Sequence, residues 1–170
     1  VTLHQHPAAE TDVALAAAIT NRRTDRRNFS SRPVSLGDIA WMGARVARMG
    51  VSLRRVETTT DFKAVLTQAT WEHAIDPDYA EELKNWSGRH AAAAGVPARN
   101  APESDPGSPV PTRFFVGTAL EQPPHAPPAY DNGVLLALGI AGDDDLSRLR
   151  AGEATSVALL TATVRGLATC

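Results

Sequence analysis

Proline is distributed unevenly along this chain, and that distribution limits where helices and strands can form. Nine of the 12 prolines lie within residues 97–128, where glycine, serine and aspartate are also common. Proline fixes φ and has no backbone N–H, so such a stretch forms neither a helix interior nor a central strand. A loop of roughly 30 residues is unusual in a compact domain and is typical of a lid, a wrapping arm or a disordered segment. The pattern predicts a proline-rich arm over residues 97–132, with one short ordered piece at residues 114–116.

The residues before the arm predict four helices and one strand. The first helix is expected over residues 11–19, with Thr11 or Asp12 as its N-cap. Ser35, with Asp38 three residues later, predicts the capped start of a second helix, which Gly50 ends. The remaining expected elements are a strand over residues 51–56, a helix over residues 61–74 and a helix that starts at Asp76 and Pro77.

Regular structure is expected to resume after the arm. Residues 134–140 form an unbroken apolar run bounded by Gly133 and Gly142, which predicts a strand buried on both faces. Three aspartates, residues 143–145, then open the longest helix, where negative charge complements the helix dipole, and Gly166 ends it. Small residues along this helix would let another helix approach closely. Helices outnumber strands and alternate with them, so the expected fold class is mixed α/β (α+β), without internal repeats.

The bulk composition argues against several classes of protein. A chain of 170 residues has about the length of one domain and can bury a core. Its net charge of −2 gives no support to a protein that coats nucleic acid or an anionic membrane. The apolar stretches are shorter than the ~20 residues that span a bilayer, and the first residues lack the order of a signal peptide. A single cysteine, Cys170, cannot form a disulfide framework within the chain. We therefore expect a cytoplasmic protein, and the sequences at the two ends predict a fragment or a processed chain.

The strongest local signal is the segment formed by residues 22–27, which we call the arginine cluster. Its four arginines and Thr24 follow directly on the first expected helix. Guanidinium groups, a hydroxyl and exposed backbone N–H groups are the donors that a phosphate needs. The alternative is a solvated charge cluster that marks the end of a helix, where the dipole stabilises cations. On local chemistry alone both interpretations stay open.

Other polar and aromatic residues predict structure rather than chemistry. The five histidines show no metal-ligand spacing on a shared helix face, so no metal site is expected. Cys170 is expected to be a buried apolar residue, since the sequence positions no base beside it. Glu153 is expected to be a buried acid that pairs with Arg150 or with the arginine cluster. Three tryptophans occupy helical positions and are expected to pack: Trp41, Trp71 and Trp86.

Two separate stretches of the chain resemble the nitroreductase-like FMN enzymes. That family opens with a helix followed by Arg-Arg/His-Ser/Thr-x-Arg/Lys and an aromatic residue, and the matching positions here are Arg22, Arg23, Thr24, Arg26 and Phe29. Residues 149–154, 159–163 and 166–170 are similar to the family's central helix. That helix typically packs across the two-fold axis of a dimer and leads to the flavin. The two matches occur in the family's order along the chain.

The middle of the chain resembles a narrower group, the dormancy-associated actinobacterial Acg-type nitroreductase-like proteins. The resemblance is carried by Trp71, by Asp76-Pro77, by Trp86-Ser87-Gly88 and by the long proline-rich segment with Arg113-Phe114. These proteins contain two nitroreductase-like halves in one chain. The resemblance implies that residues 1–170 form a single half-domain, corresponding to the C-terminal half. It also implies a central, mostly antiparallel sheet flanked by helices, which is incomplete in this chain.

The resemblance further implies a cofactor and its contacts. Arg22, Arg23 and Thr24 would contact the ribityl phosphate of FMN, and Arg26 would reach the N1/C2=O edge of the isoalloxazine ring. The implied activity is that of an NAD(P)H-dependent nitroreductase, in which hydride passes from the nicotinamide to flavin N5 and then to a nitroaromatic or a quinone. No side chain is needed as a catalytic acid or base. Besides FMN and NAD(P)H, the implied partner is the N-terminal half of the same chain or a second subunit of a dimer.

The same resemblance leaves parts of the flavin pocket to be supplied from elsewhere. The family's Ser-x-x-Asn-x-Gln-Pro-Trp segment does not occur here, and the segment expected to contact flavin N5 would follow Cys170. One alternative function is a catalytically silent protein that stores or sequesters FMN beneath an arm that blocks the nicotinamide. Another is an anion- or nucleic-acid-binding module built on residues 22–32. The net charge of −2 and the lack of interleaved aromatic residues argue against that module.

Overall fold

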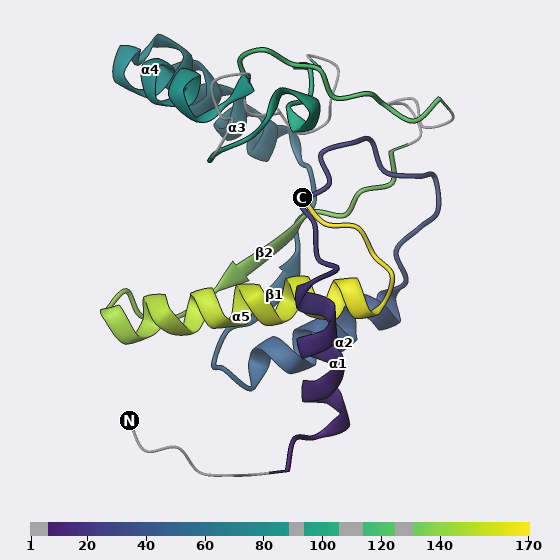
Figure 1. The fold of residues 1–170 in the computed structure, drawn as a ribbon. Coiled ribbons are helices and arrows are strands. Elements are labelled where there is room, and N and C mark those ends of the chain that lie inside the picture. The colour runs from purple at the N-terminus through teal and green to yellow at the C-terminus, as the bar shows by residue number, and fades with distance from the viewer. Residues whose placement is uncertain (1–6, 89–93, 106–113, 125–130) are drawn as a thin grey trace. The chain divides into compact units, whose positions relative to one another are not determined.

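The computed structural model describes residues 7–88, 94–105, 114–124 and 131–170, which form a mixture of helices and short strands (Figure 1). In chain order the elements are α1 (Glu10–Ile19), α2 (Leu36–Ala47), β1 (Ser52–Arg55), α3 (Thr60–Ile75), α4 (Pro77–Trp86), the 3-10 helix η2 (Ala98–Asn100), β2 (Leu136–Gly139) and α5 (Asp145–Val164). The helices and the two-stranded antiparallel sheet confirm the expected α+β class.

The chain divides into two compact units. The first unit contains residues 7–24, 34–55 and 136–170, and therefore α1, α2, α5 and both strands. The second unit contains the described parts of residues 25–33 and 56–135, and therefore α3, α4 and η2.

The core of the first unit forms where α5 packs against α1 and α2 (Figure 1). Its buried cluster consists of Val46, Val51, Ala154 and Ala158. On α5 the buried residues Ala154, Ala158 and Ala162 recur every four positions, so they line one face of the helix. Their small side chains leave room for the neighbouring helices. This is the helix-on-helix packing that the small residues predicted.

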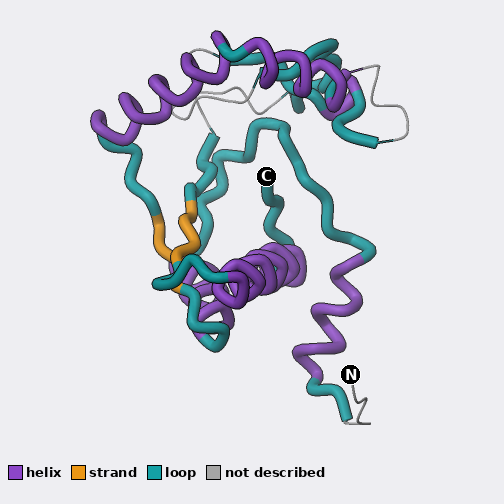
Figure 2. The backbone as a smooth tube through the Cα atoms, turned by 90° about the vertical axis from the view of Figure 1, so that its left-hand side faces the viewer, coloured by secondary structure: helices purple, strands orange, loops and turns teal. Residues whose placement is uncertain are grey.

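Strands β1 and β2 pair in antiparallel fashion, and Figure 2 shows them side by side. The register sets Ser52 opposite Gly139 and Arg55 opposite Leu136. Along β2 the half-buried Leu136 and Leu138 alternate with exposed residues, so the expectation of a strand buried on both faces was wrong. The reason is the antiparallel pairing, which allows one face to pack on the core while the other meets solvent.

Two helix starts follow the capping residues expected from the sequence, and a third is capped by one of the three aspartates expected at the start of α5. The Ser35 hydroxyl accepts a hydrogen bond from the Asp38 N–H at 3.0 Å and donates one to the Asp38 carboxylate at 2.7 Å. The side chains of Asp76 and Asp144 accept hydrogen bonds from first-turn N–H groups of α4 and α5. The starts of these helices could be located from the local sequence because each cap uses only residues within one helical turn.

Helices α1 and α3 begin slightly earlier than expected. The N-cap of α1 is Ala9, which offers no side-chain hydrogen bond, so the prediction that Thr11 or Asp12 caps this helix was wrong. Both residues lie instead in the first turn, where the charge of Asp12 still complements the helix dipole. For α3 the Thr59 hydroxyl accepts from the Phe62 N–H at 3.2 Å, which starts the helix one residue before the expected position.

The second unit buries little of its helical surface. Helices α3 and α4 contact each other, and the rings of His73 and Tyr79 stack with their centres 4.3 Å apart. Trp71 and Trp86 are 56% and 53% exposed, so the expectation that they pack was wrong. Neither helix contributes a residue to a buried core among the described residues. In the first unit Trp41 is also partly exposed and lies against the guanidinium groups of two arginines.

Part of the proline-rich arm is fixed to the C-terminal end of α4. The buried Ser87 hydroxyl donates to the Leu83 carbonyl at 2.6 Å and accepts from the Val116 N–H at 3.1 Å. The arm also returns to residues 98–101, where the Ala119 N–H donates to the Ala98 carbonyl at 3.0 Å. The short piece expected at residues 114–116 is therefore held by hydrogen bonds. The expected arm also includes residues 106–113 and 125–130, which lie outside the described residues.

Replacing Gly88 with alanine is expected to release this part of the arm. Gly88 has φ 73°, and an added Cβ would lie 2.2 Å from the Val116 carbonyl oxygen. The clash and the positive φ both oppose a side chain, so we expect a loss of about 1–3 kcal/mol in stability. Hydrogen exchange at the Val116 N–H, followed by NMR, measures the release directly. Unchanged protection of that N–H would contradict the packing described here, and Gly37→Ala, with only ordinary contacts around its added Cβ, is the matched control.

Candidate functional site

Arg22, Arg23 and Thr24 lie at the exit of α1 in the first unit. The Arg22 N–H donates to the Ala18 carbonyl at 2.9 Å and so extends the last turn of the helix. Two residues later Thr24 forms an isolated parallel β-bridge with Thr169, which belongs to the segment that leaves α5. The first three residues of the arginine cluster therefore lie beside the C-terminal end of the long alanine-rich helix.

Arg22 and Thr24 present donors that the protein uses only in part. Arg22 is half-buried, and its Nη1 donates to the Thr24 hydroxyl oxygen at 3.4 Å. Within the described residues neither side chain has another hydrogen bond. The hydroxyl proton of Thr24 and the remaining N–H groups of Arg22 can therefore point to one acceptor. A guanidinium fork beside a hydroxyl has the donor chemistry that a phosphate dianion requires.

Arg23 also hydrogen-bonds to backbone carbonyls at the C-terminal end of α1. Its Nη1 donates to the carbonyls of Thr20 and Arg22, each at 2.8 Å. A cation at these last carbonyls is stabilised by the helix dipole. This contact therefore fits the alternative interpretation, in which the cluster marks the end of a helix. Both hydrogen bonds use one nitrogen, and the guanidinium has further N–H donors on Nη2 and Nε. Arg23 can thus end the helix and still contact an anion.

Arg26 lies in the second unit, against an aromatic ring that the sequence analysis did not connect with it. Its guanidinium carbon is 5.5 Å from the centre of the Phe115 ring, within the range of a cation–π contact. Both side chains are half-buried. A contact with a ring face requires no directed N–H hydrogen bond, so the guanidinium keeps its donors for another acceptor.

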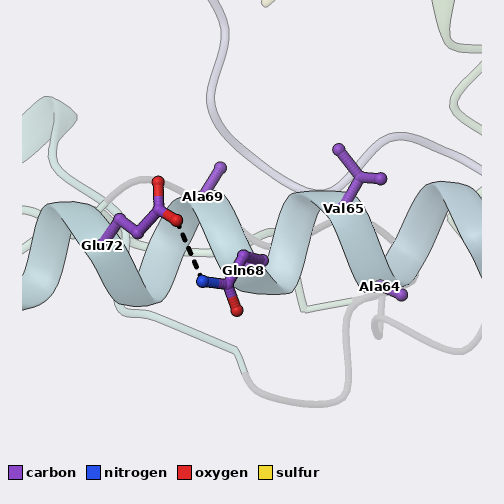
Figure 3. A pocket seen from close by; sticks show the side chains of 5 residues that line it. All are labelled: Ala64, Val65, Gln68, Ala69 and Glu72. Atoms are coloured by element: carbon purple, nitrogen blue, oxygen red, sulfur yellow. Dashed lines mark hydrogen bonds between the residues drawn. The ribbon is translucent and has the colours of Figure 1, made fainter.

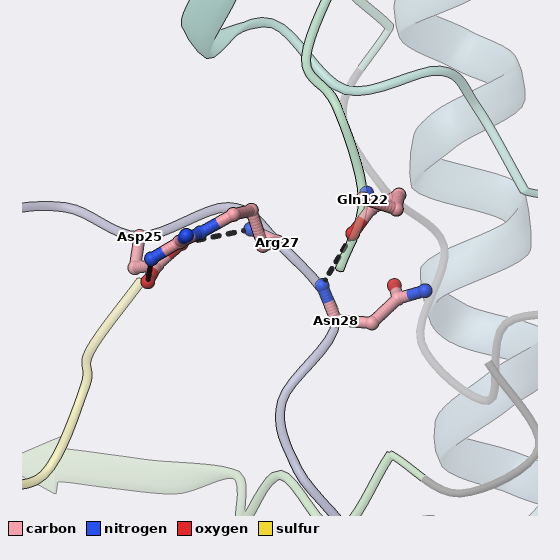
Figure 4. A network of polar contacts seen from close by, with 4 residues as sticks. All are labelled: Asp25, Arg27, Asn28 and Gln122. Carbon is pink, nitrogen blue, oxygen red and sulfur yellow. Dashed lines mark hydrogen bonds and ion pairs between the residues drawn. The ribbon is translucent and has the colours of Figure 1, made fainter. Parts of the chain in front are cut away.

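Arg27 is neutralised by its own neighbour, Asp25 (Figure 4). The carboxylate accepts from Arg27 Nη2 at 2.6 Å, from Nε at 2.8 Å and from the backbone N–H at 3.1 Å. This pair was not predicted from the sequence, although an acid two residues before a base was a visible signal. Arg27 therefore adds no net charge to the cluster. The candidate anion ligands that remain are Arg22 and Arg23 in the first unit and Arg26 in the second.

The Asp25–Arg27 pair predicts a measurable pH dependence. The hydrogen bond from the Arg27 side chain lowers the pKa of Asp25 below its ordinary 3.8, against the opposing effect of partial burial. A lowered pKa stabilises the folded state above pH ~4, and this contribution is lost as the pH falls through the folded-state value. Carboxyl NMR should show Asp25 titrating below pH 3.8. In Arg27→Gln the midpoint should rise, and an unchanged midpoint would show that the pair does not form in solution.

The described residues form shallow hollows on α3 and between α1 and α5. The hollow on α3 is formed by one face of that helix, where Gln68 donates to Glu72 at 2.9 Å (Figure 3). Its lining has a carboxylate and no cation, so it does not suit a phosphate. The hollow between α1 and α5 adjoins the arginine cluster, because its lining includes Asn21, the residue before Arg22. The other residues that line it are small or apolar apart from one threonine: Ala14, Ala17, Ala18, Thr163 and Val164.

Two further expectations about single residues were wrong. Cys170 is exposed, because it lies in the irregular segment after α5 and not on a packed helix face. Glu153 is exposed and forms no ion pair among the described residues. It precedes the buried Ala154 by one position and therefore points away from the packed face of α5. Near the start of that helix Arg148 pairs instead with Asp143 at 3.1 Å and with Asp145 at 3.9 Å.

Among the described residues, no group of three or more His, Cys, Asp or Glu side chains could hold a metal ion. No helix in this part of the chain combines the length and the hydropathy needed to cross a bilayer. Four of the five histidines lie outside the described residues: His4, His6, His90 and His125.

Comparison with other proteins identifies similar sequences. No protein-family model matches the chain. Two relatives, from two strains of Mycobacterium tuberculosis, are each 56% identical to it over 161 residues, which is 95% of this chain and 47% of the relative. Both carry the name "Putative NAD(P)H nitroreductase". The chain thus spans about half the length of the curated relatives that it matches.

Proposed function

We propose that this protein binds FMN and acts as an NAD(P)H-dependent, nitroreductase-like oxidoreductase in the cytoplasm. The observation that carries the proposal is the donor set of Arg22 and Thr24, which lies beside the segment that leaves α5. The names of the two mycobacterial relatives support the same class of reaction.

In this proposal the chain's side chains bind and orient the cofactor. Arg22, Arg23 and Thr24 hold the ribityl phosphate through charge-assisted hydrogen bonds. Arg26 would reach the N1/C2=O edge of the ring, where a cation favours the reduced cofactor. When bound, FMN supplies the hydride chemistry, from the nicotinamide to a nitroaromatic or a quinone. The transfer requires no catalytic acid or base from this chain.

A second function, FMN storage without turnover, is favoured by the way the arm is held. Within the second unit the Gln122 side chain accepts from the Asn28 N–H at 2.8 Å, and Asp131 accepts from the Phe29 N–H at 3.0 Å. In this alternative the arm, held to the backbone that follows Arg26, excludes the nicotinamide from a flavin bound at Arg26 in the same unit. The sequence motifs for the two functions are the same, so only turnover separates them.

We also propose that a second nitroreductase-like half completes the flavin pocket, either from the same polypeptide or from a second subunit. Large apolar side chains on α1, α3 and α5 are more than half exposed, including Val13, Val65 and Leu149. A second half that packs on these side chains would remove their apolar surface from water. The relatives, of which this chain covers 47%, have the length that two such halves require.

The visible spectrum of the intact, purified protein tests the proposal. FMN binding should give a flavin band near ~450 nm that remains after gel filtration. Anaerobic addition of NADPH should then bleach the band and, with a nitroaromatic present, restore it. Persistent yellow colour in the presence of NADPH would support storage instead. A protein that stays colourless after incubation with FMN would overturn both functions.

A further inference from the structure

The segment after the arginine cluster is attached to the proline-rich arm at several points. The Asn28 N–H donates to Gln122 at 2.8 Å (Figure 4), and the Phe29 N–H donates to Asp131 at 3.0 Å. The Asn132 side chain donates to the Ser31 carbonyl. All these residues belong to the second unit. The backbone that follows Arg26 is therefore held by residues 94 to 102 positions away in the sequence.

The ring that meets Arg26 is itself held in place. Phe115 precedes Val116, whose N–H is bound by the buried Ser87 hydroxyl at 3.1 Å. The carbonyl of Val116 lies so close to Gly88 that no Cβ fits between them. The Phe115 backbone thus has little freedom to move away. Its neighbour Phe114 is 67% exposed, so the two adjacent phenylalanines differ in environment.

We propose that Phe115 is a positioning residue for Arg26. The Phe115 ring holds the guanidinium 5.5 Å from its centre by a cation–π contact and leaves the N–H donors free to face an anionic ligand. For a flexible arginine, an ordered guanidinium also lowers the entropy that is lost when the ligand binds. The assignment of the ligand as FMN rests on the function proposed above, whereas the positioning of Arg26 does not.

Phe115→Leu, Phe115→Tyr and the neighbouring control Phe114→Leu test this role. In cofactor-free protein, NMR should show that the Arg26 side chain becomes more mobile in Phe115→Leu and stays ordered in the other two variants. In FMN-bound protein, Phe115→Leu should lower the ratio of affinities for reduced and oxidised FMN by about threefold to tenfold, given the usual strength of cation–π contacts. Phe115→Tyr should restore the ratio, because tyrosine keeps the ring face.

A double variant separates positioning from general damage to the fold. If Phe115 acts through Arg26, Phe115→Leu should have no further effect on the affinity ratio in an Arg26→Gln background. An additional loss there would overturn the inference, as would an Arg26 side chain equally mobile in wild type and Phe115→Leu. An ordered Arg26 in a protein that never binds FMN would support the positioning role and would instead defeat the proposed function.

Discussion

Replacing Arg22 with glutamine is expected to raise the Kd for FMN by about 10- to 100-fold. A hydrogen bond to a charged group contributes about 1.5–3 kcal/mol, and each 1.4 kcal/mol changes an affinity tenfold. Arg22 is half-buried, so solvent and salt screen its charge less than that of an exposed arginine. Its hydrogen bond to the Thr24 hydroxyl also links the two donors, and glutamine is too short to keep that geometry. Titration of apoprotein into FMN, followed by flavin fluorescence, measures the change.

Arg54→Gln is the matched control for Arg22→Gln. Arg54 is exposed on β1, in the same unit, and its replacement removes the same charge. Because exposed charges are well screened at physiological salt, its effect on the Kd should stay within about twofold. Equal weakening by both substitutions would mean that the overall charge, and not a phosphate site at the end of α1, attracts FMN.

Enlarging Ala154 to leucine is expected to destabilise the protein by about 1–3 kcal/mol or more. Ala154 is fully buried in the cluster with Val46 and Val51, where α5 packs on α2. Three extra carbon atoms there force the helices apart or push side chains off their preferred rotamers. Urea denaturation followed by circular dichroism gives the free energy of unfolding. Full stability of this variant would contradict the packing of α5 against α2.

Gly152→Ala, on the same helix, should have the opposite effect. Gly152 is exposed, and an added Cβ would have no heavy atom within 4 Å. Alanine stabilises a helix relative to glycine by about 0.5–1 kcal/mol, so the free energy of unfolding should rise by that amount. Destabilisation by this substitution would show that another surface packs on this face of α5 in the intact protein, as the proposed second half would.

The helices were predictable because their signals are local. Ser35 and Asp76 cap helices through hydrogen bonds within one turn, and the pattern of residues revealed both of them. Asp144 was expected at the start of α5 for its charge and was not identified as the N-cap. The environment of β2 was not predictable in the same way, because an apolar run does not reveal whether its partner strand is parallel or antiparallel. The exposure of Trp71 is a similar case, since a helical position does not reveal what covers it.

The candidate site was predictable only in part, for the same reason. The residues of the cluster could be read from a contiguous motif, whereas the pairing of Thr24 with Thr169 appears only in the structure, because the two residues are far apart in the sequence. Phe115 could not be found, because no sequence rule pairs it with Arg26 across almost 90 intervening residues. The Asp25–Arg27 pair could have been predicted from its spacing, but the three other arginines of the cluster were equally close candidates for pairing with Asp25.

A comparison of FMN with riboflavin tests the phosphate site most directly, since the two ligands differ only in the phosphate group. Both affinities should be measured by fluorescence titration on the same intact protein, in wild type and in Arg22→Gln. We expect wild type to prefer FMN by about 100-fold or more, as several charge-assisted hydrogen bonds require, and Arg22→Gln to lose most of that preference. Equal affinity of wild type for the two ligands would contradict the central claim that Arg22, Arg23 and Thr24 hold a flavin phosphate.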